Sequence, residues 1–215
     1  MNVPVVIENE ADAKAYVRTV GGEAGLEKAD RFGDLLLEEN TRQNLVSARS
    51  AEMLWQRHLA DSAQLLEYVP RETTTDATLT WLDLGAGPGL PGLVIAILRP
   101  DYEVKLVESR SRRVEFMNSC VAELLLKNCE VIGDRLERID PFPASVISAR
   151  AFAPLPKLLD SAKPFSTADT VLILPKGRSA RQEHEALTQD VRHMFHVEQS
   201  LTDTEAGIIV GRPNA

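Results

Sequence analysis

A glycine-rich segment behind a short apolar run is the feature that most constrains the fold of this chain. Thr80–Leu84 is short, apolar and bounded by turn residues, as expected of a buried parallel strand. Gly85, Gly87 and Gly89 follow, and glycine permits positive φ angles and a close approach of the backbone to a ligand. Pro91 suits the first turn of a helix, where a missing N–H costs little. We therefore expect a strand, a tight turn and a helix that place a ligand beyond the carboxyl end of a sheet.

The chemistry of this segment favours a ligand without phosphate groups. Residues 87–92 match the dinucleotide pattern G-x-G-x-x-G, but that site needs backbone N–H groups directed at a pyrophosphate. Pro88 and Pro91 each remove one N–H, and the carboxylate of Asp83 at the strand end would repel phosphate. A cofactor with a cationic centre fits better, and S-adenosylmethionine is the common one. An ordinary glycine-rich turn is the alternative. We expect Asp83, Gly85 and Gly87 to belong to the cofactor site.

A second strand, Glu103–Glu108, ends in an acidic residue. Glu108 lies roughly twenty residues beyond the glycine turn, where a carboxylate accepts hydrogen bonds from ribose hydroxyls in such folds. By itself Glu108 would be read as a solvated charge at a strand end. Together with the glycine turn, it predicts a ribose contact.

Strand-like and helix-like segments alternate after the glycine turn, which predicts a doubly wound, mostly parallel sheet with helices on both faces. The last two strands have no clear helix between them, which suggests an antiparallel edge. This seven-stranded α/β plan is that of the class I, Rossmann-like methyltransferases that use S-adenosylmethionine. Further strands are expected at 130–133, 145–148, 171–174, near Val197 and at 208–210, and helices at 112–126, 155–163 and 180–191.

The N-terminal third reads as helical rather than alternating. Leu26, Ala29, Phe32, Leu36 and Leu37 approximate a helical stripe. A polar, threonine-rich stretch then separates this part from the glycine turn. We expect an N-terminal helical cap over residues 1–70, a connection over 71–78 and a catalytic domain over 79–215.

Composition restricts the functional class. The 215 residues include 44% hydrophobic and 26% charged residues, which is ordinary for a globular protein. No apolar run reaches membrane-spanning length, and the N-terminus has no signal sequence, so we expect a cytoplasmic protein. Cys120 and Cys129 are expected to be reduced, and few Cys and His residues argue against a metal site. The net charge of −8 argues against nonspecific nucleic-acid binding but permits a local basic face.

Several motifs resemble those of the bacterial small-subunit ribosomal RNA methyltransferase G family, historically called glucose-inhibited division protein B. The resemblance runs from about residue 30 to about residue 185. Its most specific parts are the two prolines in the glycine turn and an upstream Arg-His-x-x-Asp-Ser, which general methyltransferases lack. The matching segments are Asn44–Val46, Arg57–Ser62, Asp83–Gly92, Arg112–Phe116, Arg150–Ala153 and Pro175–Gly177.

The resemblance implies methylation of N7 of one guanosine in 16S ribosomal RNA, with S-adenosylmethionine as the methyl donor. It also implies that Gly85 and Leu90 line the cofactor, that Leu136 and Glu137 face its adenine end, and that Arg150 closes the site. The commoner family form is Ser-Arg-Ala. Here an alanine separates the serine from Arg150, so the reach of this arginine is not fixed by the motif.

Guanine N7 needs no general base, because its in-plane lone pair is unprotonated at neutral pH. Catalysis is then expected to rest on proximity and electrostatic positioning. Arg150 or Lys176 would hold guanine O6 or a phosphate while N7 attacks. The target base has to be exposed or flipped out of folded RNA. Candidates for RNA contacts are Arg112, Arg113, Arg135, Lys176 and Arg178, although Arg112 and Arg113 could equally be a solvated helix start, and Arg135 could pair with a neighbouring acid.

Other interpretations stay open at this point. His58 lies near Asp61 and could be a catalytic acid, but an internal hydrogen bond that ties the cap to the sheet is the favoured reading. A small-molecule methyltransferase would share the glycine turn. A nicotinamide oxidoreductase would tolerate Glu108 but not easily Pro88 and Asp83, and a noncatalytic RNA-binding module is the third class. The substrate could be naked RNA, the small subunit or its assembly intermediate. The oligomeric state is not readable, and a monomer is favoured.

Overall fold

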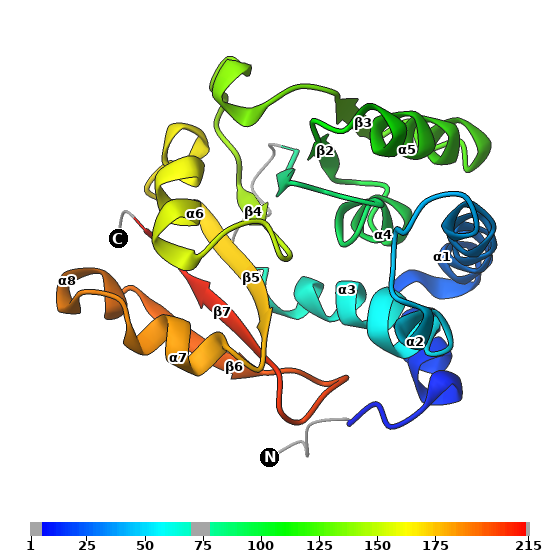
Figure 1. Cartoon of the computed structure of the whole chain (residues 1–215), viewed down its shortest axis with the longest axis horizontal. Coiled ribbons are helices and arrows are strands. Elements are labelled where there is room, and N and C mark those ends of the chain that lie inside the picture. Colours follow the sequence, from blue (N-terminus) through cyan, green and yellow to red (C-terminus); the bar gives the residue numbers. More distant parts are fainter. Residues whose placement is uncertain (1–5, 70–77, 214–215) are drawn as a thin grey trace.

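The computed structural model describes residues 6–69 and 78–213, and a seven-stranded sheet runs through their centre (Figure 1). Its strand order is β3-β2-β1-β4-β5-β7-β6. Neighbouring strands from β3 to β5 are parallel, whereas β7 is antiparallel to both β5 and β6. The predicted parallel sheet with an antiparallel edge is therefore confirmed. The strands are β1 (Thr80–Leu84), β2 (Glu103–Val107), β3 (Cys129–Ile132), β4 (Val146–Ser148), β5 (Val171–Gly177), β6 (Phe195–Gln199) and β7 (Gly207–Gly211).

The helices of the alternating region follow the predicted pattern, with one correction. The helices α5 (Ser111–Glu123) and α6 (Leu155–Ala162) lie where periodicity places them. The single helix predicted over 180–191 is wrong, because two short helices, α7 (Ala180–Glu185) and α8 (Gln189–Arg192), occupy this range. Between the two helices, Leu187 is buried in the core, and a ring nitrogen of His184 lies 2.9 Å from the carbonyl oxygen of Phe195, in β6.

The N-terminal segment is helical, as predicted. The long helix α1 (Glu10–Asn40) is kinked at Gly22, and the predicted stripe is buried except for Leu37, which is 38% exposed. Residues 70–77 lie outside the described ranges, so the predicted connection over 71–78 falls almost entirely outside them. The shorter N-terminal elements are α2 (Ala48–Ala51), the π-type turn η1 (Trp55–Ala60), α3 (Asp61–Ala63) and the 3₁₀ turn η2 (Gln64–Tyr68).

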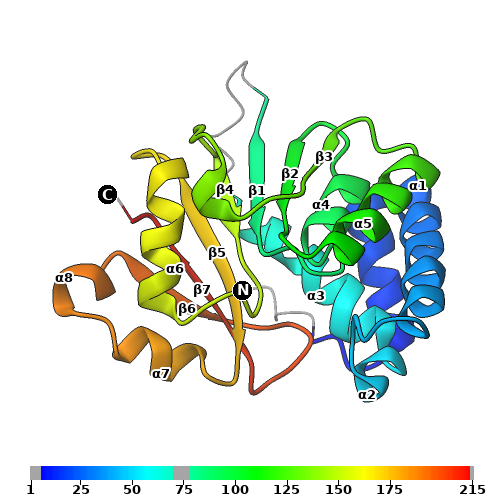
Figure 2. The ribbon, with the colours of Figure 1, turned by 45° about the horizontal axis from the view of Figure 1, so that its top comes forward.

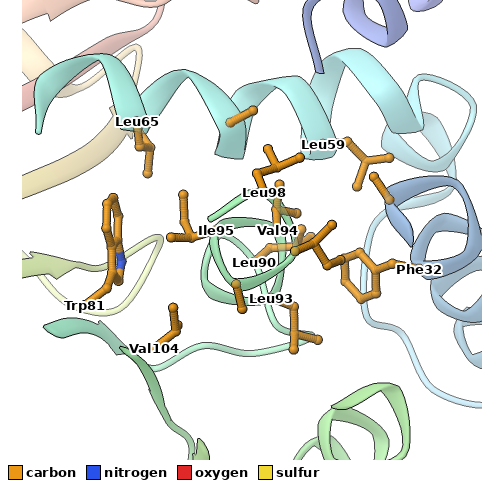
Figure 3. Close-up of a cluster of buried hydrophobic side chains, with 14 of the residues drawn as sticks. Phe32, Leu59, Leu65, Trp81, Leu90, Leu93, Val94, Ile95, Leu98 and Val104 are labelled. Carbon is orange, nitrogen blue, oxygen red and sulfur yellow. The ribbon is translucent and has the colours of Figure 1, made fainter. Parts of the chain in front are cut away.

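Helix α4 (Gly92–Leu98), which follows the glycine turn, is buried on all sides. It lies between the sheet and the N-terminal helices, which explains why its sequence is apolar throughout rather than amphipathic. In Figure 3, Trp81 and Val104 of the sheet face Leu93 and Ile95, while Leu59 lies across α4 from them. Successive side chains of β1 alternate between faces, so Leu82 and Leu84 belong to a second cluster on the other side of the sheet.

Helix α1 packs directly against α4. A Cβ atom at Gly21 would overlap the side chain of Leu98, and one at Gly25 would come within 3.2 Å of it. Helices α1, α4 and α5 lie beside β1–β3, whereas α6, α7 and α8 lie at the other end of the sheet (Figure 1, Figure 2). The N-terminal helices thereby support the helix that begins at the glycine turn.

Two classes of feature are missing from the parts of the chain that the structure describes. No helix there is long and apolar enough to cross a membrane. No group of three or more His, Cys, Asp or Glu side chains within residues 6–69 and 78–213 could hold a metal ion. Cys120 is buried, Cys129 is partly buried, and both are free thiols.

Candidate functional site

The turn after β1 adopts backbone conformations that favour glycine. The φ angles of Gly85, Gly87 and Gly89 are +66°, +58° and +89°, which confirms the conformational reason for their presence. Gly85 is also crowded, because a Cβ atom there would lie 2.5 Å from Cδ2 of Phe152. The ring of Phe152 therefore covers the turn at the one glycine that follows the strand directly.

Every backbone N–H from Ala86 to Gly92 already has an acceptor within the protein. Residues 88 and 91 are prolines and have none to offer. This turn cannot direct free N–H groups at a pyrophosphate, so the geometry excludes the dinucleotide mode that the sequence pattern matches. The donations run from Ala86 to the carbonyl of Val107, from Gly87 to Glu108, from Gly89 and Leu90 to the carbonyl of Ala86, and from Gly92 to Asp83.

Asp83 lies beneath the turn rather than in an open site. Its side chain is fully buried, where it accepts hydrogen bonds from the Ser148 hydroxyl at 2.7 Å and from the backbone N–H of Gly92 at 3.0 Å. Trp81 Nε1 donates to the same serine oxygen at 2.8 Å. Burial raises the pKa of Asp83 to about 6, although the bonds from Ser148 and Gly92 oppose this shift. Asp83 therefore links β1, β4 and the start of α4.

The raised pKa of Asp83 predicts a pH-dependent stability difference. A carboxyl group whose folded-state pKa exceeds its unfolded value stabilises the fold fully below the unfolded pKa, and this contribution is lost as the pH rises through the folded pKa of about 6. We expect the unfolding free energy of wild type, relative to Asp83→Asn, to fall by about 2 kcal/mol between pH 4 and pH 7. Urea denaturation of both proteins across this range measures the difference. A difference in unfolding free energy between the two proteins that does not change with pH would contradict the prediction.

Glu108 joins the end of β2 to the glycine turn. Its carboxylate accepts from the N–H groups of Ser109 at 2.8 Å, Arg110 at 3.0 Å and Gly87 at 3.1 Å. The guanidinium of Arg113 lies 3.6 Å from the same carboxylate. These contacts fix a mostly buried carboxylate beside the turn. Oε1 accepts two of these bonds and Oε2 one, so the lone pair left on Oε2 is what a ribose hydroxyl would use.

A pocket of about 380 Å³, called the first pocket, opens at the carboxyl ends of β1, β2 and β3. Its volume lies in the range of small-molecule sites. Three carboxylates line it, from Glu108, Asp134 and Glu137, and Leu136 contributes an apolar wall. Folding brings six of the predicted residues together here: Gly85, Glu108, Arg113, Arg135, Leu136 and Glu137.

Removing the charge of Glu108 should weaken cofactor binding. We expect Glu108→Gln to raise the Kd for S-adenosylmethionine about tenfold, because hydrogen bonds to a charged acceptor contribute more than those to a neutral amide. Isothermal titration calorimetry measures this Kd. Glu130→Gln is the matched control, because Glu130 is exposed on the neighbouring strand and its carboxylate pairs with Lys105. An unchanged Kd in Glu108→Gln would exclude the ribose contact.

A second pocket, of about 650 Å³, adjoins the first pocket. Residues Ala151, Phe152 and Ala153 line both, so this loop after β4 forms the boundary between them. Arg150 and Lys176 line the second pocket but not the first. The two predicted substrate-positioning residues thus lie on the same side of the loop, away from the first pocket.

Lys176 is held firmly in the wall of the second pocket. Its ammonium donates to the carbonyl of Ala153 at 2.9 Å and lies 3.0 Å from the carboxylate of Glu183. Burial opposes ionisation of Glu183, but hydrogen bonds from Ser179 and Lys176 outweigh it and hold the pKa of Glu183 below its ordinary value. This carboxylate is therefore charged and committed to Lys176, so it is poorly suited to act as a base.

Arg150 turns towards the N-terminal helices. Its Nη2 lies 2.9 Å from Nδ1 of His58, and its Nη1 lies 3.5 Å from the carboxylate of Asp61. These three residues line a third pocket, of about 210 Å³, which shares Arg150 with the second pocket but is not lined by Phe152. The internal hydrogen bond favoured for His58 is present, and its partner is the arginine whose reach the motif left open.

The remaining predicted residues are dispersed. Arg112 lies in a separate groove with Glu39 and Gln43, and Arg178 pairs with Glu205 at an exposed position. Neither Gly87 nor Leu90 lines one of these three pockets. Their place is in the turn itself, where Gly87 bonds to Glu108.

Sequence reasoning missed Phe152 as a site residue. It stands in the segment Arg150–Ala153, but no pattern shows that its ring would face Gly85. The positive φ of Ala151, +51°, turns the chain there, and nothing in the sequence signals a left-handed alanine. Ser109, Arg110 and Lys157 also line the first pocket, and no motif in the sequence identified them.

Solved structures with the same fold are methyltransferases and related proteins. Mitomycin 7-O-methyltransferase MmcR aligns with a TM-score of 0.55 at 12% identity, over 97% of this chain and 74% of that one. A ribosomal protein L11 methylase from Lactobacillus delbrueckii subsp. bulgaricus aligns with a TM-score of 0.53 at 14% identity, over 71% of this chain and 78% of that one. At such identities the likeness establishes the fold, which is that of the class I methyltransferases.

Sequence comparison identifies the family. Ribosomal RNA small subunit methyltransferase G of Erythrobacter litoralis is 50% identical over 98% of this chain and 99% of that protein. The protein of the same name from Novosphingobium aromaticivorans is 48% identical over 97% of this chain and 90% of that protein. The family model described as rRNA small subunit methyltransferase G matches residues 25–208. The chain therefore belongs to the rRNA small subunit methyltransferase G family.

Proposed function

We propose that this protein transfers the methyl group of S-adenosylmethionine to N7 of a guanosine in the RNA of the small ribosomal subunit. Family membership and the names of its relatives support the RNA substrate, and the N7 position follows the family resemblance. The observation that carries the proposal is that the first and second pockets adjoin each other on either side of the loop after β4. The first has a carboxylate beside the glycine turn, and the second has two cations, from Arg150 and Lys176.

The residues of the first pocket fit S-adenosylmethionine. Glu108 is placed to accept the ribose hydroxyls, and Leu136 offers an apolar contact for the adenine. Gly85 lines this pocket beside the ring of Phe152, and the N–H groups of the glycine turn are already bonded within the protein, so the turn offers none to a phosphate-bearing ligand. When bound, S-adenosylmethionine would supply an electrophilic methyl group on a sulfonium centre.

The protein does not have to remove a proton for this reaction. Guanine N7 carries its lone pair in the ring plane, and the carboxylate that lines the second pocket is engaged by Lys176. Arg150 and Lys176 would instead donate to O6 or to a phosphate of the target nucleotide, which leaves N7 free to attack. Holding the base in line with the methyl group is then the main contribution to rate.

Basic residues around the pockets would contact the RNA backbone. Arg113 and Arg135 line the first pocket, while Arg112 and Arg178 lie outside both pockets and would reach phosphates further along the substrate. Because the chain carries a net charge of −8, such local contacts have to act against overall repulsion. This favours a structured substrate, 16S ribosomal RNA in the small subunit or its assembly intermediate, over nonspecific RNA. We propose that a monomer performs the reaction.

Methyl transfer to small ribosomal subunits tests the proposal directly. Subunits from cells that lack this protein would be incubated with labelled S-adenosylmethionine, and the digested nucleosides would be separated by mass spectrometry. The expected product is labelled 7-methylguanosine at one position. Cofactor binding without label in any RNA would move the function to a small-molecule substrate. A protein that binds no S-adenosylmethionine would overturn the assignment of the first pocket.

A further inference from the structure

His58 and Arg150 form a contact between the N-terminal helices and the catalytic side of the sheet. His58 lies in the π-type turn η1, and Arg150 follows β4 by two residues. Arg150 Nη2 donates to His58 Nδ1 at 2.9 Å, and the Asp61 carboxylate lies 3.5 Å from Nη1. The partners are separated by 92 residues, so the contact exists only because the N-terminal helices dock on this end of the sheet.

His58 is a neutral acceptor in this contact. Its side chain is 3% exposed, and burial together with the cations of Arg150 and Arg57 lowers its pKa to about 3. A neutral imidazole has one protonated and one bare ring nitrogen, and an arginine can only donate. The bare nitrogen is therefore Nδ1, and the proton is on Nε2. The histidine offers Arg150 a single, directional acceptor.

The backbone turn that carries His58 is anchored at several points. The Glu10 carboxylate accepts from the N–H groups of Trp55 at 2.9 Å and Gln56 at 2.8 Å. Arg57, the neighbour of His58, pairs with Asp203 at 2.7 Å. Short π-type segments inside helices frequently occur at functional sites. These contacts hold the turn that carries the imidazole in place, so His58 can restrict the conformation of the flexible Arg150 side chain.

We propose that His58 is a positioning residue that holds the Arg150 guanidinium at the second pocket for methyl transfer to the RNA. Nη2 is occupied by His58, while Nη1 is buried and makes no hydrogen bond; its charged neighbour is the Asp61 carboxylate, 3.5 Å away. A buried N–H group that makes no hydrogen bond is free to donate to an acceptor that enters the site. That acceptor is an oxygen of the substrate nucleotide. The inference rests on the proposed function and adds to it the residue that orients Arg150.

A double-mutant cycle with Arg150 separates positioning from a purely structural role. We expect His58→Ala to lower kcat/KM for the subunit substrate about tenfold in the wild-type background and to change it little in an Arg150→Ala background. A residue that only stabilises the fold would lower activity equally in both. The Kd for S-adenosylmethionine and the thermal unfolding midpoint of each variant are measured in parallel, and an affinity loss of the same size as the activity loss would contradict the inference.

Two amide substitutions test which ring nitrogen matters. The side-chain amide of His58→Asn falls near the position of Nδ1, whereas that of His58→Gln falls near Nε2. We expect asparagine to restore most of the activity that alanine loses and glutamine to restore little. Equal rescue by both, or additive losses in the cycle above, would overturn the positioning role. A wild-type protein that methylates no RNA would instead overturn the proposed function, and this inference with it.

Discussion

Replacing Gly85 by alanine should raise the Kd for S-adenosylmethionine about a hundredfold, because two unfavourable effects meet at this position. The φ angle of +66° is costly for a residue with a Cβ atom, by about 1–2 kcal/mol. The added Cβ would also lie 2.5 Å from the ring of Phe152, so the ring has to move. Phe152 lines the first pocket, and its displacement changes the shape of the cofactor site. Titration calorimetry with S-adenosylmethionine measures the loss.

The chain offers a matched control for the backbone part of this effect. Gly22 has the same φ of +66°, but a Cβ there would meet no atom within 4 Å, and it lies in the kink of α1. Gly22→Ala should lower the unfolding free energy through backbone strain alone, without altering the cofactor Kd. In a Gly85→Ala background, Phe152→Ala should recover part of the affinity, because it removes the clash. Wild-type affinity in Gly85→Ala would show that the turn does not limit access to the first pocket.

The sequence allowed the glycine turn and its carboxylate partner to be predicted together. Glycine at three alternate positions indicates positive φ, and the observed φ values agree. The position of Glu108, at a strand end roughly twenty residues beyond the turn, predicts that it shares a ligand with the turn. The hydrogen bond from Gly87 to Glu108, at 3.1 Å, shows that the two are adjacent. Local patterns and the rules of parallel sheets were sufficient here.

The partners that meet when separate elements dock could not be predicted, although a hydrogen bond from His58 to the sheet was expected. Helical periodicity identifies the buried face of a helix, but it does not say which loop of the sheet that face meets. The Arg150–His58 and Phe152–Gly85 contacts both arise in this way. The break between α7 and α8 has a similar origin, since no Gly or Pro marks it, and Leu187 is buried there against the second cluster. Tertiary contacts override local propensity in each case.

Removing the ammonium group of Lys176 should reduce kcat by about 10²–10³-fold, the loss typical when a preorganised donor is removed from a catalytic site. The side chain of Lys176 is only 6% exposed and is fixed by Ala153 and Glu183. A mobile cationic side chain nearby therefore cannot take over the position of its ammonium group. We expect Lys176→Met to leave the Kd for S-adenosylmethionine within about twofold, because Lys176 does not line the first pocket. Single-turnover methyl transfer to small subunits measures the chemical step.

The substitution also leaves Glu183 without its cation, and this second effect has to be separated from catalysis. A buried carboxylate that loses its partner destabilises the fold. The double variant Lys176→Met/Glu183→Gln removes both charges, so it should regain thermal stability while its kcat stays low. Lys163→Met, at an exposed lysine of the 3₁₀ turn Lys163–Phe165, is the matched control for loss of one positive charge. If the double variant regained activity along with stability, Lys176 would support the loop after β4 and would not donate to the substrate.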